Sequence, residues 1–480
     1  MNYRIIFHMA GRVLLAEAGL LVLPLAVSLL YREDCAWAVL ASMAVAAVLG
    51  GLLTLLARPR SHKFFSREGY IIVALAWVLL SAVGALPFWF SREIPSYADA
   101  FFETVSGFTT TGASILTDVE SMSHGLLFWR SFTHWIGGMG VLVLIMAIVP
   151  TETGRSIHIM RAEMPGPIVG KLMPRIKDTA QILYLMYVVL TVVQIVLLMA
   201  GGMPPFESVT HAMATAGTGG FSVKADCFTG YSPYLQWVTA IFMTLFGVNF
   251  NVYYLALRKK FKEILRSTEL WAYLGIILVS IVLVSISIST EYDTLEEIVR
   301  QSAFQVTSII TTTGYASTNF DLWPELAKNI LLILMFLGAC AGSTGGGLKV
   351  SRAILLVKMA RRELKRMIHP RSVGTVQFEG KRVSDATLNS VCMYFVLYVI
   401  ILVALTLFLC INPFSIETNL AAAASCFNNI GPGFGIAGPA SNYSYYNAIS
   451  KFVLTISMLF GRLEIYPMLL ALSPSTWTKE

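Results

Sequence analysis

Long apolar stretches recur along the whole chain, and short polar segments separate them. They predict ten membrane-crossing helices, at about 11–30, 36–57, 69–90, 125–149, 180–201, 234–257, 270–289, 329–357, 388–411 and 448–471. Each is long enough to cross a hydrocarbon core of ~30 Å, for which a helix needs ~20 residues. We therefore predict an all-α polytopic membrane protein. The first stretch is too long for a secretory signal and lacks a small-residue cleavage pattern, so we expect a retained helix.

The eight crossings after the first two form four pairs, and each pair encloses a short helical segment that ends in a similar loop. These segments, at 100–108, 208–216, 302–310 and 419–427, are too short to cross the membrane. We predict that each dips into the membrane and returns through its loop. The four loops are Thr109-Thr110-Thr111-Gly112, Gly217-Thr218-Gly219-Gly220, Thr311-Thr312-Thr313-Gly314 and Asn428-Asn429-Ile430-Gly431.

Four such loops in equivalent positions predict a cation filter. Irregular backbone is tolerated at membrane depth only inside protein or beside a watery cavity. Backbone carbonyl groups can replace the water around a dehydrated cation, and glycine leaves no side chain in the way. We expect residues 109–112, 218–220, 311–314 and 428–431 to bind the ion.

The pattern divides the chain into five parts. Residues 1–68 hold two N-terminal helices, and four repeats of crossing, half-crossing and crossing follow at 69–150, 151–258, 259–370 and 371–480. Internal repeats are a common construction in transporters, whose binding sites lie at the repeat interface. The prediction is thus four repeats around one central pore.

Composition and charge agree with a membrane location. Hydrophobic residues make up 56% of the chain and charged residues 13%, with a mean hydropathy of +0.68. Of the 35 Lys and Arg residues, 27 lie in segments that the predicted crossings place on one side. Because basic loops stay in the cytoplasm, we expect both termini there and all four loops entering from outside. The net charge of +7 then reflects orientation, and we expect no nucleic-acid partner.

Several other functions lack the residues that they require. The six cysteines have no CxxC spacing, so neither a disulfide framework nor a metal site is indicated. No constellation of carboxylates, Ser/His or zinc ligands predicts an intramembrane enzyme. The chain has no Walker A loop and no GxGxxG after a strand, so nucleotide control would need a separate subunit. The basic loop at 358–382 either attracts anionic membrane lipid or docks such a regulator.

Glycine interrupts the crossing at 329–357. A glycine costs up to about 1 kcal/mol relative to alanine in a helix, so we expect a break here. The segment either packs closely against another helix or unwinds below the filter and moves when ions pass. Its gating candidates are Gly338, Gly342, Ser343, Thr344, Gly345, Gly346 and Gly347, with Lys349, which we expect at the cytoplasmic mouth.

Seven separated motifs resemble the bacterial potassium-uptake proteins of the TrkH type, in the Trk/Ktr/HKT superfamily. They are SGFTTTGAS (106–114), RAEMPGP (161–167), GTGGFS (217–222), ITTTGYAS (310–317), GACAGSTGGGLKV (338–350), NNIGPGFG (428–435) and LFGRLEIYP (459–467). The resemblance covers nearly the whole chain. It implies a homodimer in the bacterial inner membrane and a cytosolic nucleotide-binding regulatory subunit of the TrkA type.

The resemblance also assigns the ion. It implies one filter glycine per loop, here Gly112, Gly220, Gly314 and Gly431. In the second loop Gly217 and Gly219 could share the role. Plant relatives that favour sodium have serine at the first position, so Gly112 indicates potassium as the transported ion. The chain itself would hold no cofactor. A sodium-permeable or sodium- or proton-coupled relative is the alternative.

Charged and polar residues within the membrane leave further choices open. Arg462 pairs with Glu464 or with loop carbonyls, or, as the resemblance favours, it lies near the ion path and limits flux. Glu103 and Glu207, near the outer starts of half-helices, either suit the helix dipole or attract cations. Three histidines have no metal-like companions, and we expect satisfied polar groups: His124, His134 and His211.

Overall fold

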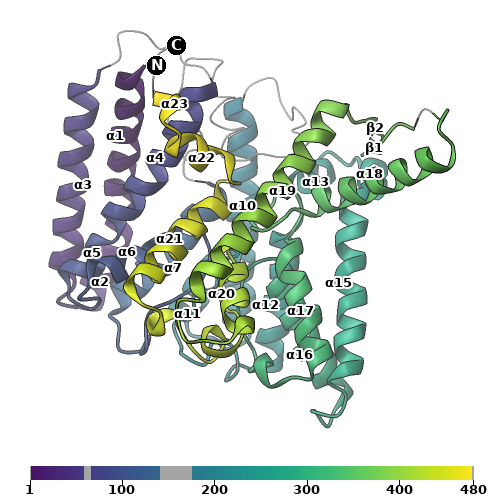
Figure 1. The fold of residues 1–480 in the computed structure, drawn as a ribbon. Helices are drawn as coiled ribbons and strands as arrows, with labels where there is room; N and C mark the ends of the chain where they lie inside the picture. The colour runs from purple at the N-terminus through teal and green to yellow at the C-terminus, as the bar shows by residue number, and fades with distance from the viewer. Residues whose placement is uncertain (1, 59–65, 141–175, 373, 478–480) are drawn as a thin grey trace.

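The computed structural model describes residues 2–58, 66–140, 176–372 and 374–477. Helices dominate these residues, and their only strands are the two-residue pair β1 (Gln377–Phe378) and β2 (Lys381–Arg382). The predicted all-α class is confirmed. Both ends of the chain lie at the same end of the bundle (Figure 1).

Two helical segments at the N-terminus form a hairpin beside the rest of the molecule. α1 (Tyr3–Leu20) leads into α2 (Val22–Leu30), and α3 (Ala36–Leu56) returns along α1 (Figure 1). Glycines allow the two backbones to approach, because a β carbon at Gly50 would lie 2.9 Å from the Gly11 carbonyl oxygen. α1 also packs against α4 (Ser66–Gly84), which joins the hairpin to the bundle.

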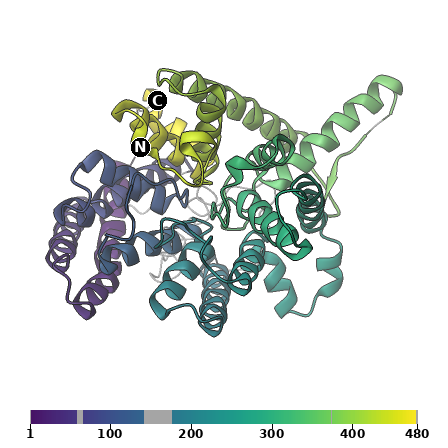
Figure 2. The same cartoon turned by 90° about the horizontal axis from the view of Figure 1, so that it is seen from below.

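Four units follow, and Figure 2 shows them around a central axis in chain order. The helices of the first two units are α4, α5 (Leu86–Phe90), α6 (Tyr97–Phe108) and α7 (His124–Gly138), then α10 (Ile176–Ala200), α11 (Pro205–Gly217), α12 (Pro233–Phe246), α13 (Phe250–Leu257) and α14 (Phe261–Leu265). Those of the last two are α15 (Thr268–Ser287), α16 (Leu295–Ile310), α17 (Glu325–Leu337) and α18 (Val350–Ile368), then α19 (Asp385–Leu409), α20 (Ile416–Asn428), α21 (Ala448–Arg462), α22 (Tyr466–Leu472) and α23 (Pro474–Trp477). The exact boundaries of the repeats stay a prediction.

The short helices α6, α11, α16 and α20 begin three to seven residues before the predicted segments, where capping residues occur. The side chains of Ser96, Thr294 and Ser415 each accept a hydrogen bond from a backbone N–H in the first turn, which satisfies an otherwise unpaired donor. α11 begins instead with Pro205, whose missing N–H costs nothing in a first turn.

The second long helix of each unit is not continuous in the structure, and the sequence predicts only the break within 329–357. Among the described residues, six helices are long and apolar enough to cross a membrane, or seven if α12 and α13 form one span bent by 89°. The predicted crossing 329–357 is split into α17 and α18, and 448–471 is split into α21 and α22. α7 ends at Gly138, and residues 141–149 of the crossing 125–149 lie outside the described part.

Close backbone contacts lie beside two of these breaks. A β carbon at Gly137 in α7 would lie 1.9 Å from the carbonyl oxygen of Phe108, which ends α6. One at Gly461 in α21 would lie 2.0 Å from the carbonyl oxygen of Phe427, near the end of α20. The ends of the short helices therefore press against the long helices at glycines. Hydrophobic periodicity does not report such contacts.

The N-terminal hairpin yields a stability test. Gly50→Ala should destabilise the protein by about 1–3 kcal/mol, because the added methyl meets the backbone of α1. Gly51→Ala is the matched control, since nothing lies within 4 Å of its β-carbon position. Alanine favours a helix over glycine, so the control should be neutral or slightly stabilising. Thermal unfolding in detergent would compare them, and equal midpoints would contradict the close packing of α1 and α3.

Candidate functional site

The four loops share one backbone conformation despite their different residues. In each loop, a residue with left-handed backbone angles is followed two positions later by a glycine with positive φ. The left-handed residues are Thr110, Thr218, Thr312 and Asn429, with φ between 54° and 59°. The glycines are Gly112, Gly220, Gly314 and Gly431, with φ of 76°, 78°, 80° and 104°. We call these four the ring glycines. In the second loop, Gly220 is therefore the equivalent of Gly112, and Gly217 and Gly219 are not.

Each ring glycine touches a carbonyl oxygen of the next loop, so that the contacts close a ring. A β carbon at Gly112 would lie 2.0 Å from the oxygen of Gly219, and one at Gly220 would lie 2.0 Å from that of Thr313. The corresponding distance from Gly314 to the oxygen of Ile430 is 1.8 Å.

The fourth contact closes the ring, because a β carbon at Gly431 would lie 2.8 Å from the Thr111 oxygen. Both the backbone angle and the space thus require glycine at these positions.

Side-chain hydrogen bonds fasten the loops behind this ring. The hydroxyl groups of Thr109 and Thr111 lie 2.8 Å apart, and those of Thr311 and Thr313 are also 2.8 Å apart. The Asn429 amide donates to the Thr111 hydroxyl at 2.9 Å and links the fourth loop to the first. All five side chains are fully buried. The threonine pairs therefore brace the first and third loops internally, and Asn429 joins the fourth loop to the first.

A cavity of about 170 Å³, which we call the outer cavity, is bordered by all four ring glycines. Its other lining residues include Arg130, whose guanidinium forms a buried ion pair with Glu103 at 2.7 Å. Glu103 also accepts hydrogen bonds from Ser114 and from the backbone of Ile115, both just after the first loop. Glu103 is thus a paired internal residue of α6 and does not lie at the start of the helix, where the helix dipole would favour it.

The glycine-rich segment forms a loop between α17 and α18. We call residues 338–349 the intramembrane loop, and it lies against the loops that follow α16 and α20. The Gly346 N–H donates to the Thr312 hydroxyl at 2.6 Å, and a β carbon at Gly346 would lie 2.4 Å from the Asn428 oxygen. The Cys340 N–H donates to the Gly247 carbonyl, at the break between α12 and α13. The expected break in the helix is confirmed.

A buried carboxylate also holds this loop. Glu269, in the first turn of α15, accepts a hydrogen bond from the Ala341 N–H at 2.7 Å and is 5% exposed. The N–H of Glu269 in turn donates to the carboxylate of Glu379, in the turn between β1 and β2, at 3.0 Å. Sequence patterns miss this link, because Glu269 looks like an ordinary acidic residue of a first helical turn.

Arg462 reaches across to three separate elements. Its guanidinium donates to the Thr344 carbonyl at 2.8 Å, to the Gly138 carbonyl at 2.6 Å and to the Thr110 hydroxyl at 3.3 Å. Glu464 pairs instead with Arg352 of α18. The interpretation of an Arg462–Glu464 pair is wrong, and that of contacts with loop carbonyls holds.

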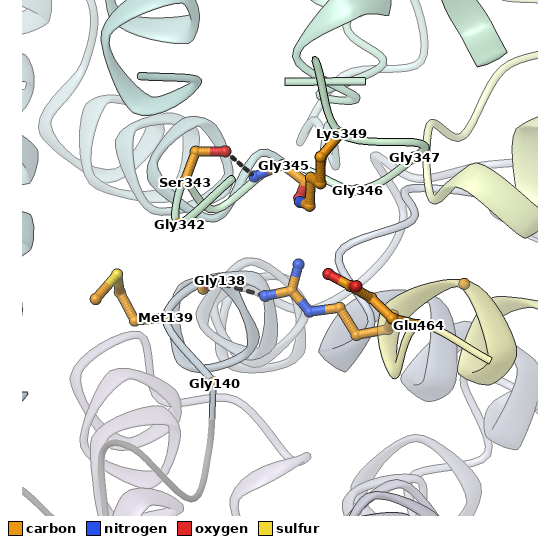
Figure 3. A pocket seen from close by; sticks show the side chains of 12 residues that line it. Gly138, Met139, Gly140, Gly342, Ser343, Gly345, Gly346, Gly347, Lys349 and Glu464 are labelled. Carbon is orange, nitrogen blue, oxygen red and sulfur yellow. Dashed lines mark hydrogen bonds between the residues drawn. The ribbon is translucent and has the colours of Figure 1, made fainter. Parts of the chain in front are cut away.

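A second, smaller cavity of about 50 Å³, the inner cavity, lies between the intramembrane loop and the break between α21 and α22 (Figure 3). Arg462, Glu464 and Lys349 are among its lining residues. Lys349 is buried and donates to the Gly345 carbonyl, so its side chain folds back onto its own loop. Arg462 and Lys349 therefore place two positive groups at this cavity.

The three histidines differ in their surroundings. His124 pairs with Glu33 at 2.8 Å, and His211 contacts the Glu207 carbonyl and the Ser222 hydroxyl. His134 is fully buried, and neither ring nitrogen has a hydrogen-bond partner among the described residues. The expectation of a satisfied polar residue is therefore wrong for His134. The motif at 161–167 lies outside the described residues.

Comparisons with known proteins fit this geometry. The family model described as TrkH, cation transport protein, matches residues 37–479. This chain belongs to the TrkH family of cation transport proteins. The Trk system potassium uptake protein TrkH of Salmonella typhimurium is 37% identical, covering 99% of this chain and 100% of that protein. TrkG of Escherichia coli K12 is 34% identical over 99% of both chains. The crystal structure of the potassium transporter TrkH from Vibrio parahaemolyticus has a TM-score of 0.90 and 32% identity, with full coverage of both chains.

Membership in the TrkH family confirms three predictions. The sequence resemblance is correct, the chain is a polytopic membrane protein, and its family transports cations and is not a family of enzymes. The ring glycines and the intramembrane loop are therefore parts of a protein from a cation transporter family. Their roles stay predictions.

The ring makes a specific prediction for glycine substitutions. Gly112→Ser and Gly314→Ser should reduce discrimination between cations, because the new β carbon meets a backbone oxygen of the next loop. Gly202→Ala is the matched control: its φ is 85°, but nothing lies within 4 Å. Cation flux into vesicles would measure the effect. Folded serine variants with unchanged discrimination would remove these glycines from the filter.

Proposed function

We propose that this chain takes up potassium across the bacterial inner membrane through the ring of its four loops. The closed set of contacts between ring glycines and carbonyl oxygens carries the proposal. Such a ring brings backbone oxygens from four unlike loops close together, where they could replace the water of a dehydrated ion. The potassium uptake named for the relatives supports the choice of ion.

The four short helices add electrostatic support. Each ends at its loop, so its C-terminal partial charge of about −0.5 lies close to the ring. Four such ends favour a cation without burying a carboxylate at the ring. Ions would enter from the outer cavity and leave past the inner cavity. This direction rests on the proposed orientation, with both termini in the cytoplasm.

The intramembrane loop and Arg462 form the proposed gate. The loop contacts the filter through Thr312, and the Arg462 guanidinium ties its Thr344 carbonyl to the end of α7. Movement of the loop would break these hydrogen bonds and open the inner cavity. Shifting such a gate from 1:99 to 99:1 requires about 5.5 kcal/mol of differential binding energy.

A cytosolic nucleotide-binding subunit of the TrkA type would supply that energy, and the transporter would act as a homodimer. The basic surface of α18 and the adjacent β1–β2 turn is the proposed dock. A path of contacts leads from it to the gate, since Glu379 binds the first turn of α15 and Glu269 there holds Ala341. α18 itself follows the loop directly.

Ion flux into liposomes tests the proposed function. Purified protein should carry potassium and rubidium strongly and sodium and lithium weakly when each gradient is applied in turn. The ring offers backbone oxygens and no side-chain hydroxyl at the glycine positions. Equal potassium and sodium flux would favour a sodium-permeable transporter. Dependence of potassium flux on a sodium or proton gradient would favour a coupled one.

Removing the Arg462 charge should increase flux. Arg462→Ala removes both a positive charge and the tie to the intramembrane loop, so conductance should rise roughly fivefold for each ~1 kcal/mol by which the barrier falls. Arg462→Gln keeps a hydrogen-bond donor without the charge and separates the two effects. Single-channel or vesicle flux measurements would compare the variants. Wild-type conductance in folded Arg462→Ala would place the charge away from the ion path.

Loss of the Glu269 carboxylate should loosen the gate. A hydrogen bond to a charged group contributes about 1.5–3 kcal/mol, so Glu269→Ala should raise the open fraction at rest by roughly 10- to 100-fold from a low starting value. Glu269→Gln retains an acceptor oxygen for the Ala341 N–H and should stay near wild type. Flux without the regulatory subunit is the measurement. Unchanged resting flux in the alanine variant would show that the loop is held elsewhere.

A further inference from the structure

The second filter loop lacks a side chain where the other three have one. The residue before the ring glycine is Thr111, Thr313 or Ile430 in loops one, three and four, and it is Gly219 in loop two. The backbone does not demand this glycine, because Gly219 is not among the residues with positive φ. Its carbonyl oxygen is nevertheless part of the ring, since it contacts Gly112. Something else must hold this part of the loop in place.

The imidazole of His134 occupies the missing side-chain space. A β carbon at Gly219 would lie 1.8 Å from Nδ1, 2.3 Å from Cγ and 2.4 Å from Cε1 of His134, and these are its three nearest atoms. His134 belongs to α7 of the first unit, whereas Gly219 belongs to the second. A ring from one unit thus fills the space that a side chain of the loop itself fills in the other units.

The imidazole is fixed by stacking and not by hydrogen bonds to the described residues. It lies 4.1 Å from the ring of Phe221, centroid to centroid, at an interplanar angle of 21°. The Arg130 guanidinium carbon lies 3.5 Å from the same Phe221 centroid, and Arg130 donates to the Ser222 carbonyl. A buried polar atom without a partner costs about 1–3 kcal/mol, so His134 is an expensive way to fill this space.

We infer that His134 is a positioning residue of the filter, which sets the place of the Gly219 carbonyl oxygen and so the ion discrimination of the second loop. This inference rests on the proposed function. It explains why loop two alone has glycine before the ring glycine. It also predicts that the effects of substitutions at His134 and Gly219 are coupled, because the imidazole occupies the space that a side chain at position 219 would need.

A double-mutant cycle tests this pairing. His134→Ala leaves a void behind Gly219 and should lower the potassium-to-sodium flux ratio by about tenfold, which corresponds to ~1.4 kcal/mol between the two ions. Gly219→Ala alone should be at least as damaging, because its methyl meets the imidazole. The variant with both changes should recover much of the ratio, since the methyl then enters the vacated space. His134→Phe keeps a ring and should stay closer to wild type than His134→Ala.

Gly220→Ala supplies the matched control. Its β carbon would meet the Thr313 carbonyl oxygen at 2.0 Å, so His134→Ala should not rescue it. The inference is overturned if His134→Ala keeps the wild-type ratio, or if the double variant is no better than Gly219→Ala. If Gly219→Ala does not fold, rescue of folded protein by His134→Ala replaces the flux ratio as the measurement. If the wild-type protein does not discriminate between potassium and sodium, the proposed function is refuted. The amounts of folded protein in the wild type, the two single variants and the double variant would still test the His134–Gly219 contact.

Discussion

The contact on which the rest of this structure depends is that between each ring glycine and a carbonyl oxygen of the next loop. It leaves no room for a methyl group at three of the four positions. The loops must therefore arrive at one level with little tolerance, and a flexible connection would not deliver them there. The four short helices, the buried threonine pairs and the Glu103–Arg130 ion pair all fix loop position.

Two of the broken long helices are in contact with the ends of the short helices. For the short helices to end at the centre, their last carbonyls must come within contact of the surrounding helices, and Gly137 and Gly461 allow this at Phe108 and Phe427. The broken ends leave free carbonyl groups, and Arg462 satisfies one of them at Gly138. A residue that looks like an isolated membrane charge is thus partly a cap for a neighbouring helix end.

Sequence patterns predict the parts of this site that depend on local backbone. The four glycine-ended loops and the break in the third unit follow from conformational preference, which each segment carries within itself. The partner that a charged side chain contacts does not follow from local conformational preference. The sequence around Arg462 does not show whether its partner is the Glu464 carboxylate or the Thr344 carbonyl. Glu103 and Arg130 come into contact only when α6 and α7 pack together. Hydropathy does not predict the breaks in the other three units, because it ignores the close approach of a carbonyl to a glycine.

The ring has one joint that differs from the others. Between the fourth loop and the first, the oxygen of Thr111 stands 2.8 Å from the β-carbon position of Gly431, against 1.8–2.0 Å elsewhere, and Gly431 has the largest φ. These two units are also the furthest apart in the chain, and a side-chain hydrogen bond from Asn429 spans the joint. Under the proposed function, widening of the ring for an ion of larger radius would therefore begin at this seam, and the ring would be least stiff between the fourth loop and the first.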